Sequence, residues 1–164
     1  MISSIKDCTR LNNGIKMPWL GFGVHRINDG QDVEHAVKTA LEIGYRSIDT
    51  ATVYGNERGV GKTIRESGIP REDIFLTTKV WNDDQREKRT LAAFEESLER
   101  LETEYVDLYL VHWPVKDCYQ ETWQLMQRIY QSGRAKAIGV SNFQVHHLED
   151  VLRDSQIVPA VNQI

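Results

Sequence analysis

Four ionisable side chains follow short apolar segments of this sequence: Asp49, Tyr54, Lys79 and His112. A tyrosine hydroxyl is a weak acid, with a reference pKa of about 10. A nearby ammonium group stabilises the phenolate and lowers that pKa, and a carboxylate beside the lysine keeps the ammonium charged and in place. A neutral imidazole forms a hydrogen bond with a carbonyl oxygen. Together these groups would polarise and protonate a carbonyl, provided that another group supplies the electrons.

These residues belong to a wider set of polar strand ends. Six short apolar segments read as strands, at residues 19–23, 46–49, 74–79, 106–113, 135–141 and 160–164. The last two end in Ser141-Asn142 and Asn162-Gln163. In parallel α/β folds the chemistry collects at the carboxyl ends of the strands. The set favours an active-site rim, although each residue taken singly reads equally well as a cap, a solvated strand end or a structural histidine.

Helical periodicity fills the intervals between these segments. Strands that alternate with one-sided helices predict a parallel sheet with crossover helices. The apolar faces are formed by Val33, Ala36, Val37, Ala40 and Leu41; by Leu91, Phe94, Leu98 and Leu101; by Trp123, Met126, Ile129 and Tyr130; by Val145, Leu148, Val151 and Leu152; and, in a shorter stretch, by Val60 and Ile64.

The repeat length limits the architecture. The strands recur about every 28 residues, which is typical of one βα unit. Six units fit either an open, doubly wound sheet or an eightfold barrel that stops short, since a complete barrel takes about 250 residues. Asn13-Gly14 predicts a hairpin over about 9–17 with a two-residue type I′ turn. We expect a single domain over residues 1–164, with βα units from about residue 19.

Composition disfavours several classes of partner. The chain has 20 basic and 24 acidic residues, a net charge of −4 and no lysine/arginine cluster, so nucleic acid and anionic lipid are poor partners. No apolar run is long enough to span a membrane, and the N-terminus lacks a secretory signal. Cys8 and Cys118 stand alone, which predicts no disulfide, no structural zinc and a reducing cytoplasm.

Three further motifs are incomplete. Residues 59–63 evoke a phosphate-binding loop, but Asn56 stands where that motif needs glycine. No glycine-rich dinucleotide fingerprint follows the first strand. There is no HExxH metal motif, and His146 and His147 occupy adjacent helix positions that should point apart on the surface. We therefore predict neither a nucleoside triphosphate site nor a metal site.

Several ordered segments resemble the signatures of the aldo-keto reductase family. GYRSIDTA at 44–51, followed by Tyr54, Gly55, Asn56, Glu57 and 60–61, is similar to the first signature, and IGVSNF at 138–143 to the second. TTKVW at 77–81 and LVHWP at 110–114 resemble the segments that carry the family's lysine and histidine, and VNQI at 161–164 resembles its sixth strand. The resemblance covers the whole chain, which corresponds to about the first three fifths of a family barrel.

The resemblance implies a TIM-type (β/α)₈ barrel whose N-terminal hairpin closes the bottom, with six βα strands present in this chain. It implies metal-free reduction of aldehydes and ketones to alcohols by NADP(H), with NAD(H) still open. Tyr54 would be the general acid, Lys79 and Asp49 would tune it, and His112 would orient the carbonyl. Cofactor contacts would come from Asp49, Ser141, Asn142, Gln163 and Gly23, and substrate contacts from Trp81, Trp113, His25 and His112.

Two departures from the family pattern stand beside this interpretation. His25 occupies a position where many relatives carry an aromatic pocket residue, and the family's third signature, which contacts the adenosine 2′-phosphate, has no counterpart. We expect these residues to be part of a product of about 270–280 residues, by family analogy and the barrel length. The complete form would be a cytoplasmic monomer, whereas residues 1–164 alone could self-associate. The alternative is a non-catalytic regulatory or scaffold relative that binds the cofactor but does not turn it over.

Overall fold

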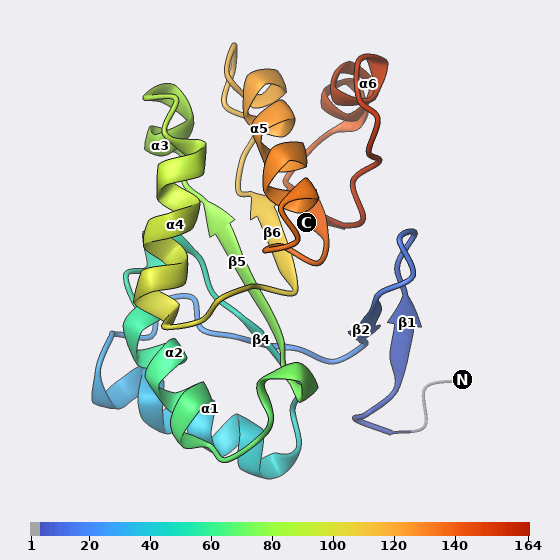
Figure 1. Ribbon diagram of the computed structural model, residues 1–164. Coiled ribbons are helices and arrows are strands. Elements are labelled where there is room, and N and C mark those ends of the chain that lie inside the picture. The colour runs from blue at the N-terminus through green and yellow to red at the C-terminus, as the bar shows by residue number, and fades with distance from the viewer. Residues whose placement is uncertain (1–3) are drawn as a thin grey trace.

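The computed structural model describes residues 4–164, which form an antiparallel hairpin and a parallel sheet flanked by helices. In Figure 1 the hairpin stands on the opposite side of the strands from α2 and α4. The strands are β1 (Cys8–Arg10), β2 (Lys16–Pro18), β3 (Phe22–Gly23), β4 (Ser47–Asp49), β5 (Phe75–Val80), β6 (Leu108–Val111), β7 (Ile138–Ser141) and β8 (Asn162–Gln163).

The sheet order distinguishes the two architectures that the repeat length left open. The six strands follow one another in the order β3-β4-β5-β6-β7-β8, and every pair is parallel. A doubly wound sheet reverses its strand order at a switch point, whereas a βα barrel adds each strand to the same edge. The sheet is therefore a curled half-barrel, and the open-sheet alternative is wrong. In residues 4–164, β3 and β8 form its two edges.

Each predicted apolar stripe lies in a helix. Those of α1, α2, α4 and α5 are largely buried, whereas α6 buries only Val151 and leaves Val145 and Leu152 exposed. The helices are α1 (Gln31–Ile43), α2 (Glu57–Glu66), α3 (Asn82–Arg86), α4 (Thr90–Leu101), α5 (Tyr119–Gln131) and α6 (Val145–Arg153), with 3₁₀ turns η1 (Thr52–Tyr54) and η2 (Arg71–Asp73).

Two glycines allow α2 to pack closely against α1 and α4. A Cβ atom on Gly61 would lie 2.2 Å from the carbonyl oxygen of Leu101, at the end of α4. On the α1 side, a Cβ atom on Gly59 would lie 2.4 Å from the Val33 side chain. The two glycines therefore set how closely α2 fits between α1 and α4.

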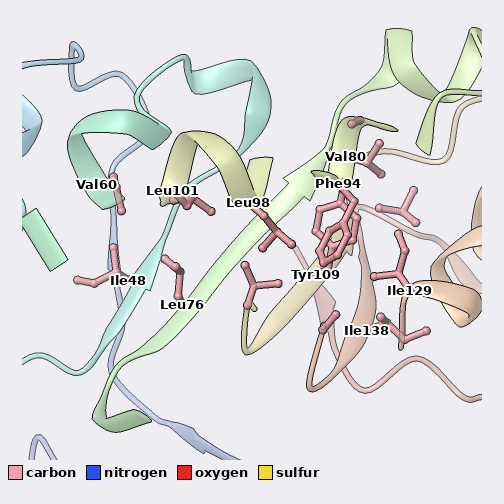
Figure 2. Close-up of a cluster of buried hydrophobic side chains, with 14 of the residues drawn as sticks. Ile48, Val60, Leu76, Val80, Phe94, Leu98, Leu101, Tyr109, Ile129 and Ile138 are labelled. Carbon is pink, nitrogen blue, oxygen red and sulfur yellow. The ribbon is translucent and has the colours of Figure 1, made fainter. Parts of the chain in front are cut away.

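The core has two parts, one on each face of the sheet. The larger part fills the space between strands and helices, and Figure 2 shows Phe94 of α4 against Tyr109 of β6, with ring centroids 4.8 Å apart. Both faces of β5 and β6 are buried, which explains the continuous apolar run of β6. The smaller part joins the inner face to the hairpin through Phe75, Leu108, Leu110, Ala137, Leu11, Ile15, Met17, Ala160 and Val161.

The hairpin is confirmed, but its predicted turn is wrong. Gly14 has a φ of 89°, whereas Asn13 is absent from the positive-φ residues, although a type I′ turn needs positive φ at both central positions. The Gly14 N–H donates to the Leu11 carbonyl and the Leu11 N–H to the Ile15 carbonyl. The connection is thus a three-residue loop, Asn12 to Gly14, in which glycine supplies the left-handed position.

The other differences from expectation are local. All six predicted strands are present. Five are shorter than their predicted apolar runs, whereas β5 has the predicted length and is shifted by one residue. Helix α3 is short and polar, and it carries no stripe that predicts it. Trp19 and Trp113 are about half exposed, so neither belongs to the core. No helix within residues 4–164 is long and apolar enough to cross a membrane.

Candidate active site at the carboxyl ends of the strands

The polar strand ends meet at one cleft. Its volume is about 880 Å³, and it lies where β4, β6, β7 and β8 end. The parallel order of the sheet brings these ends together even though they are far apart in the sequence. Of the sequence-predicted residues, the cleft is lined by His25, Asp49, Tyr54, Trp81, His112, Trp113, Ser141, Asn142 and Gln163.

Lys79 and Asp49 form an ion pair at the base of this cleft. The Lys79 Nζ lies 2.5 Å from Asp49 Oδ1 and donates a second hydrogen bond, of 2.9 Å, to the Thr50 carbonyl. The Lys79 side chain is 1% exposed, and that of Asp49 is 21% exposed. Burial lowers the pKa of the lysine, while the charge and hydrogen bond of Asp49 oppose that shift. The carboxylate thus supports a charge that burial disfavours.

Tyr54 lies against this pair. It ends η1, and its ring centroid is 5.2 Å from the Lys79 Nζ. The sequence predicted a pKa lowered by the ammonium, whereas the pKa of Tyr54 is raised, first by burial and then by the Asp49 charge. The difference arises mainly because burial disfavours the charged phenolate, and the Asp49 charge adds to this effect. At neutral pH the hydroxyl therefore keeps its proton.

His112 closes the other side of the tyrosine. Its ring centroid lies 5.7 Å from that of Tyr54 and 5.1 Å from that of Trp81, both in edge-to-face geometry. Burial and then the nearby Lys79 charge lower the pKa of His112 to about 4. Its Nδ1 is buried, and no described residue forms a hydrogen bond with it. The imidazole is therefore neutral at pH 7 and retains one ring N–H for a ligand.

Two amides and one hydroxyl line the cleft beside Asp49 and His112. Asn142 adopts left-handed geometry, with φ 62°, and its Nδ2 donates to the His112 carbonyl and to Ser141 Oγ. Gln163 Nε2 donates to Asp49 Oδ2 at 3.1 Å, and Ser141 Oγ donates to the Gln163 backbone carbonyl. These bonds use the amide nitrogens, so the two side-chain carbonyl oxygens remain available as acceptors.

Two of the predicted residues do not line the cleft. Lys79 lies beneath its surface, as its burial requires. Gly23, the last residue of β3, pairs with Asp49 but is not part of the cleft wall. A Cβ atom on Gly23 would meet nothing within 4 Å, so close backbone packing does not require glycine there.

Sequence reasoning missed a buried network behind the site. Glu57 is 1% exposed, and it accepts hydrogen bonds from Thr78 Oγ1 at 2.6 Å and from Arg100 Nε at 2.7 Å. Arg100 also donates a hydrogen bond to Ser97 Oγ, which is hydrogen-bonded to Thr52 Oγ1. The Thr52 hydroxyl in turn donates to the Lys79 carbonyl. The members come from α2, β5, α4 and η1, so only the tertiary structure brings them together. The sequence signal available was a glutamate that follows the Tyr54 loop at a helix start.

Arg26, Val53 and Ile164 also line the cleft and were not predicted. Arg26 and Val53 lie in the loops after β3 and β4, so the strand-end argument could have found them.

The remaining sequence candidates lie outside this cleft. Within residues 4–164 no group of three histidine, cysteine or acidic side chains is arranged to hold a metal. Cys8 and Cys118 are free. The prediction that His146 and His147 point apart is wrong, because their ring centroids are 3.8 Å apart. A hydrogen bond from the Gln144 N–H to His147 Nδ1 turns the second ring back along the helix, toward the first.

Comparisons with known proteins agree with this geometry. A family model described as "Aldo/keto reductase family" matches residues 19–164. The chain is 56% identical over 164 residues to a glyoxal reductase of Bacillus subtilis, covering all of this chain and 59% of that protein. It is 48% identical over 157 residues to a methylglyoxal reductase of Salmonella typhimurium, covering 94% of this chain and 56% of that protein. The chain therefore spans less than two thirds of the length of these relatives.

Solved structures give the same result. An aldo/keto reductase from Brucella melitensis matches with a TM-score of 0.92 and 52% identity, over 96% of this chain and 62% of that one. A Bombyx mori aldo-keto reductase in complex with NADP matches with a TM-score of 0.88 and 39% identity, over 99% of this chain and 59% of that one.

Proposed function

The chain belongs to the aldo-keto reductase family, and we propose that it carries the active site of an enzyme that reduces small aldehydes and ketones to alcohols with NADPH. The observation that carries this proposal is the buried Lys79–Asp49 pair against the Tyr54 ring, with a neutral His112 on the other side. These groups can donate a proton to a carbonyl oxygen and orient it without a metal.

Tyr54 is the proton donor in this proposal. Burial and the Asp49 charge hold the proton on the phenol at neutral pH, until the carbonyl oxygen develops negative charge. The Lys79 ammonium, 5.2 Å from the ring centroid, then stabilises the phenolate that remains. Asp49 keeps that ammonium charged and fixed in place. Solvent returns the proton to Tyr54 after each turnover.

His112 orients the substrate. With a pKa of about 4 it stays neutral at physiological pH, so its N–H can donate to the carbonyl oxygen while the imidazole adds no positive charge beside Lys79. Edge-to-face contacts with Tyr54 and Trp81 hold the ring between the proton donor and the cleft wall. The carbonyl oxygen is thereby placed within reach of the Tyr54 hydroxyl.

The amide and hydroxyl groups beside Asp49 and His112 fit a nicotinamide carboxamide. Asn142 and Gln163 offer side-chain oxygens that accept N–H donors, and Ser141 Oγ, already donating to a carbonyl, can accept as well. Gly23, exposed at the end of β3 but outside the cleft wall, offers bare backbone to a part of the cofactor that extends beyond the cleft. When bound, the cofactor supplies a hydride to the carbonyl carbon of the substrate, and the carbonyl oxygen takes the Tyr54 proton. The NADP complex of the silkworm relative supports NADPH over NADH.

The cleft wall and the relatives point to small carbonyl substrates. Trp81 and Trp113 give apolar, stacking surfaces, and the His25 ring lies 4.8 Å from the Tyr54 ring, beside the proton donor. The names of the bacterial relatives specify glyoxal and methylglyoxal as substrates of those proteins. We include such 2-oxoaldehydes among the substrates here. Two free cysteines support a reducing cytoplasm, and by analogy with the family we propose that the complete protein is a monomer.

NADPH consumption tests this proposal directly. The full translated protein is mixed with NADPH and methylglyoxal, glyoxal or benzaldehyde, and both NADPH absorbance and the alcohol product are followed. We expect one alcohol formed for each NADPH oxidised. If NADPH binds but none of the three carbonyls causes its oxidation, the result would instead support the regulatory alternative.

A further inference from the structure

The two tryptophans of the cleft wall come from different loops. Trp81 follows β5 and immediately precedes α3, and it packs edge-to-face on His112. Trp113 follows β6 and is 47% exposed. The width of the cleft between them therefore depends on what connects the loop after β5 to the loop after β6.

Gln85 makes that connection. Its backbone N–H donates to the Trp81 carbonyl at 3.3 Å, and its side-chain Nε2 donates to the Trp113 carbonyl at 3.1 Å. The residue is 2% exposed, and shielding from water strengthens such a bond. The Trp113 carbonyl also accepts the Val115 N–H at 2.9 Å, so one oxygen anchors both the tight turn at Pro114 and the link to α3.

Packing alone does not account for an amide at this position. Gln85 Oε1 is buried, and no described residue donates to it. A buried carbonyl without a partner is unfavourable, and an apolar side chain of similar length would fill the same space without that loss. What the amide adds is its N–H donor to the Trp113 backbone.

We propose that Gln85 is a positioning residue, which fixes Trp113 relative to Trp81 and so determines how well the cleft accepts carbonyl substrates with a large planar substituent. The expected effect on substrate preference rests on the proposed function, whereas the fixed position of Trp113 does not. A flat aromatic substituent needs the Trp113 surface in a fixed place. A substrate as small as methylglyoxal reaches Tyr54 and His112 without that surface.

The test compares Gln85→Met and Gln85→Leu, which keep approximate size and remove the donor, with the native protein. We expect the ratio of kcat/KM for benzaldehyde to kcat/KM for methylglyoxal to fall about tenfold in both variants, mainly through KM for benzaldehyde, as for a misplaced binding group. Acrylamide quenching of Trp113, taken as the difference from a Trp113→Phe counterpart of each protein, should increase.

Gln127→Met is the matched control, because Gln127 is also a buried amide whose Oε1 accepts two hydrogen bonds, but in α5. It should leave both the ratio and the quenching at native values. Native quenching of Trp113 in the two Gln85 variants overturns the proposal, as does an unchanged ratio in an active enzyme. If the native protein reduces neither aldehyde, the proposed function fails, and the quenching still decides the role of Gln85.

Discussion

At the scale of single residues, the site depends on groups held in the protonation state that burial selects. His112 is 8% exposed and lies near Lys79, and both facts disfavour its cationic form. Lys79 is more deeply buried, yet the Asp49 carboxylate supports its ammonium. Two neighbouring bases are thus driven toward different states, one neutral and one charged, which is what a proton-donating site needs.

The depressed pKa of His112 makes stability depend on pH. Its folded pKa is about 4, below the ordinary value of 6.5. Between these two values the unfolded chain binds a proton on this histidine and the folded chain does not, so the free energy of unfolding falls as pH decreases through that window. We expect the difference between the native protein and His112→Gln, measured by urea denaturation, to shrink from pH 7 to pH 4. A constant difference would contradict the assignment.

How far the sequence predicts the site is clear from particular residues. Asp49, His112 and Ser141 could be placed at one rim, since parallel strands end on the same side. The direction of the Tyr54 pKa shift could not be predicted, because it depends first on how deeply the phenol is buried and then on its closeness to Asp49. Glu57 and Gln85 were missed because their partners are distant in sequence: Thr78 and Arg100 for the first, Trp113 for the second.

At the scale of elements, hydrophobic periodicity predicted every long helix and each strand of the sheet. It could not predict α3, which has no apolar stripe, or the hairpin turn, where Asn13 keeps ordinary backbone geometry and only Gly14 turns left-handed. Periodicity also says nothing of how closely helices approach. For α2 that distance depends on Gly59 and Gly61. Because they lack a Cβ atom, the Val33 side chain of α1 and the Leu101 backbone of α4 can lie close to the helix.

Gly61→Ala tests this close approach. The added methyl group would overlap the Leu101 carbonyl, and backbone cannot move aside as a flexible side chain does. We expect a loss of about 1–3 kcal/mol in the free energy of unfolding, typical of overpacking. Arg58→Ala, at an exposed position of the same helix, should change it by less than about 0.5 kcal/mol. A Gly61→Ala protein more stable than the native one, as at an unconstrained helix site, would show that α2 and α4 are not in close contact.

At the scale of the whole molecule, the sheet of residues 4–164 has two open edges. β3 and β8 each have one strand neighbour, and Ile164 beside β8 is 99% exposed. Unpaired strand edges are templates for pairing with another chain. Residues 1–164 expressed alone should therefore self-associate, as judged by light scattering across a concentration series. A monodisperse monomer at all concentrations, with a sharp unfolding transition, would contradict this prediction.

The central claim is that the Tyr54 hydroxyl donates the proton in carbonyl reduction, and single-turnover reduction of methylglyoxal by Tyr54→Phe tests it most directly. The full translated protein, saturated with NADPH, is compared with this variant and with Tyr130→Phe, a partly buried tyrosine of α5 outside the cleft. We predict a rate lower by about 10²–10⁴ for Tyr54→Phe, the usual contribution of a general acid, with NADPH affinity unchanged, and a native rate for Tyr130→Phe. A native rate for Tyr54→Phe would contradict the claim.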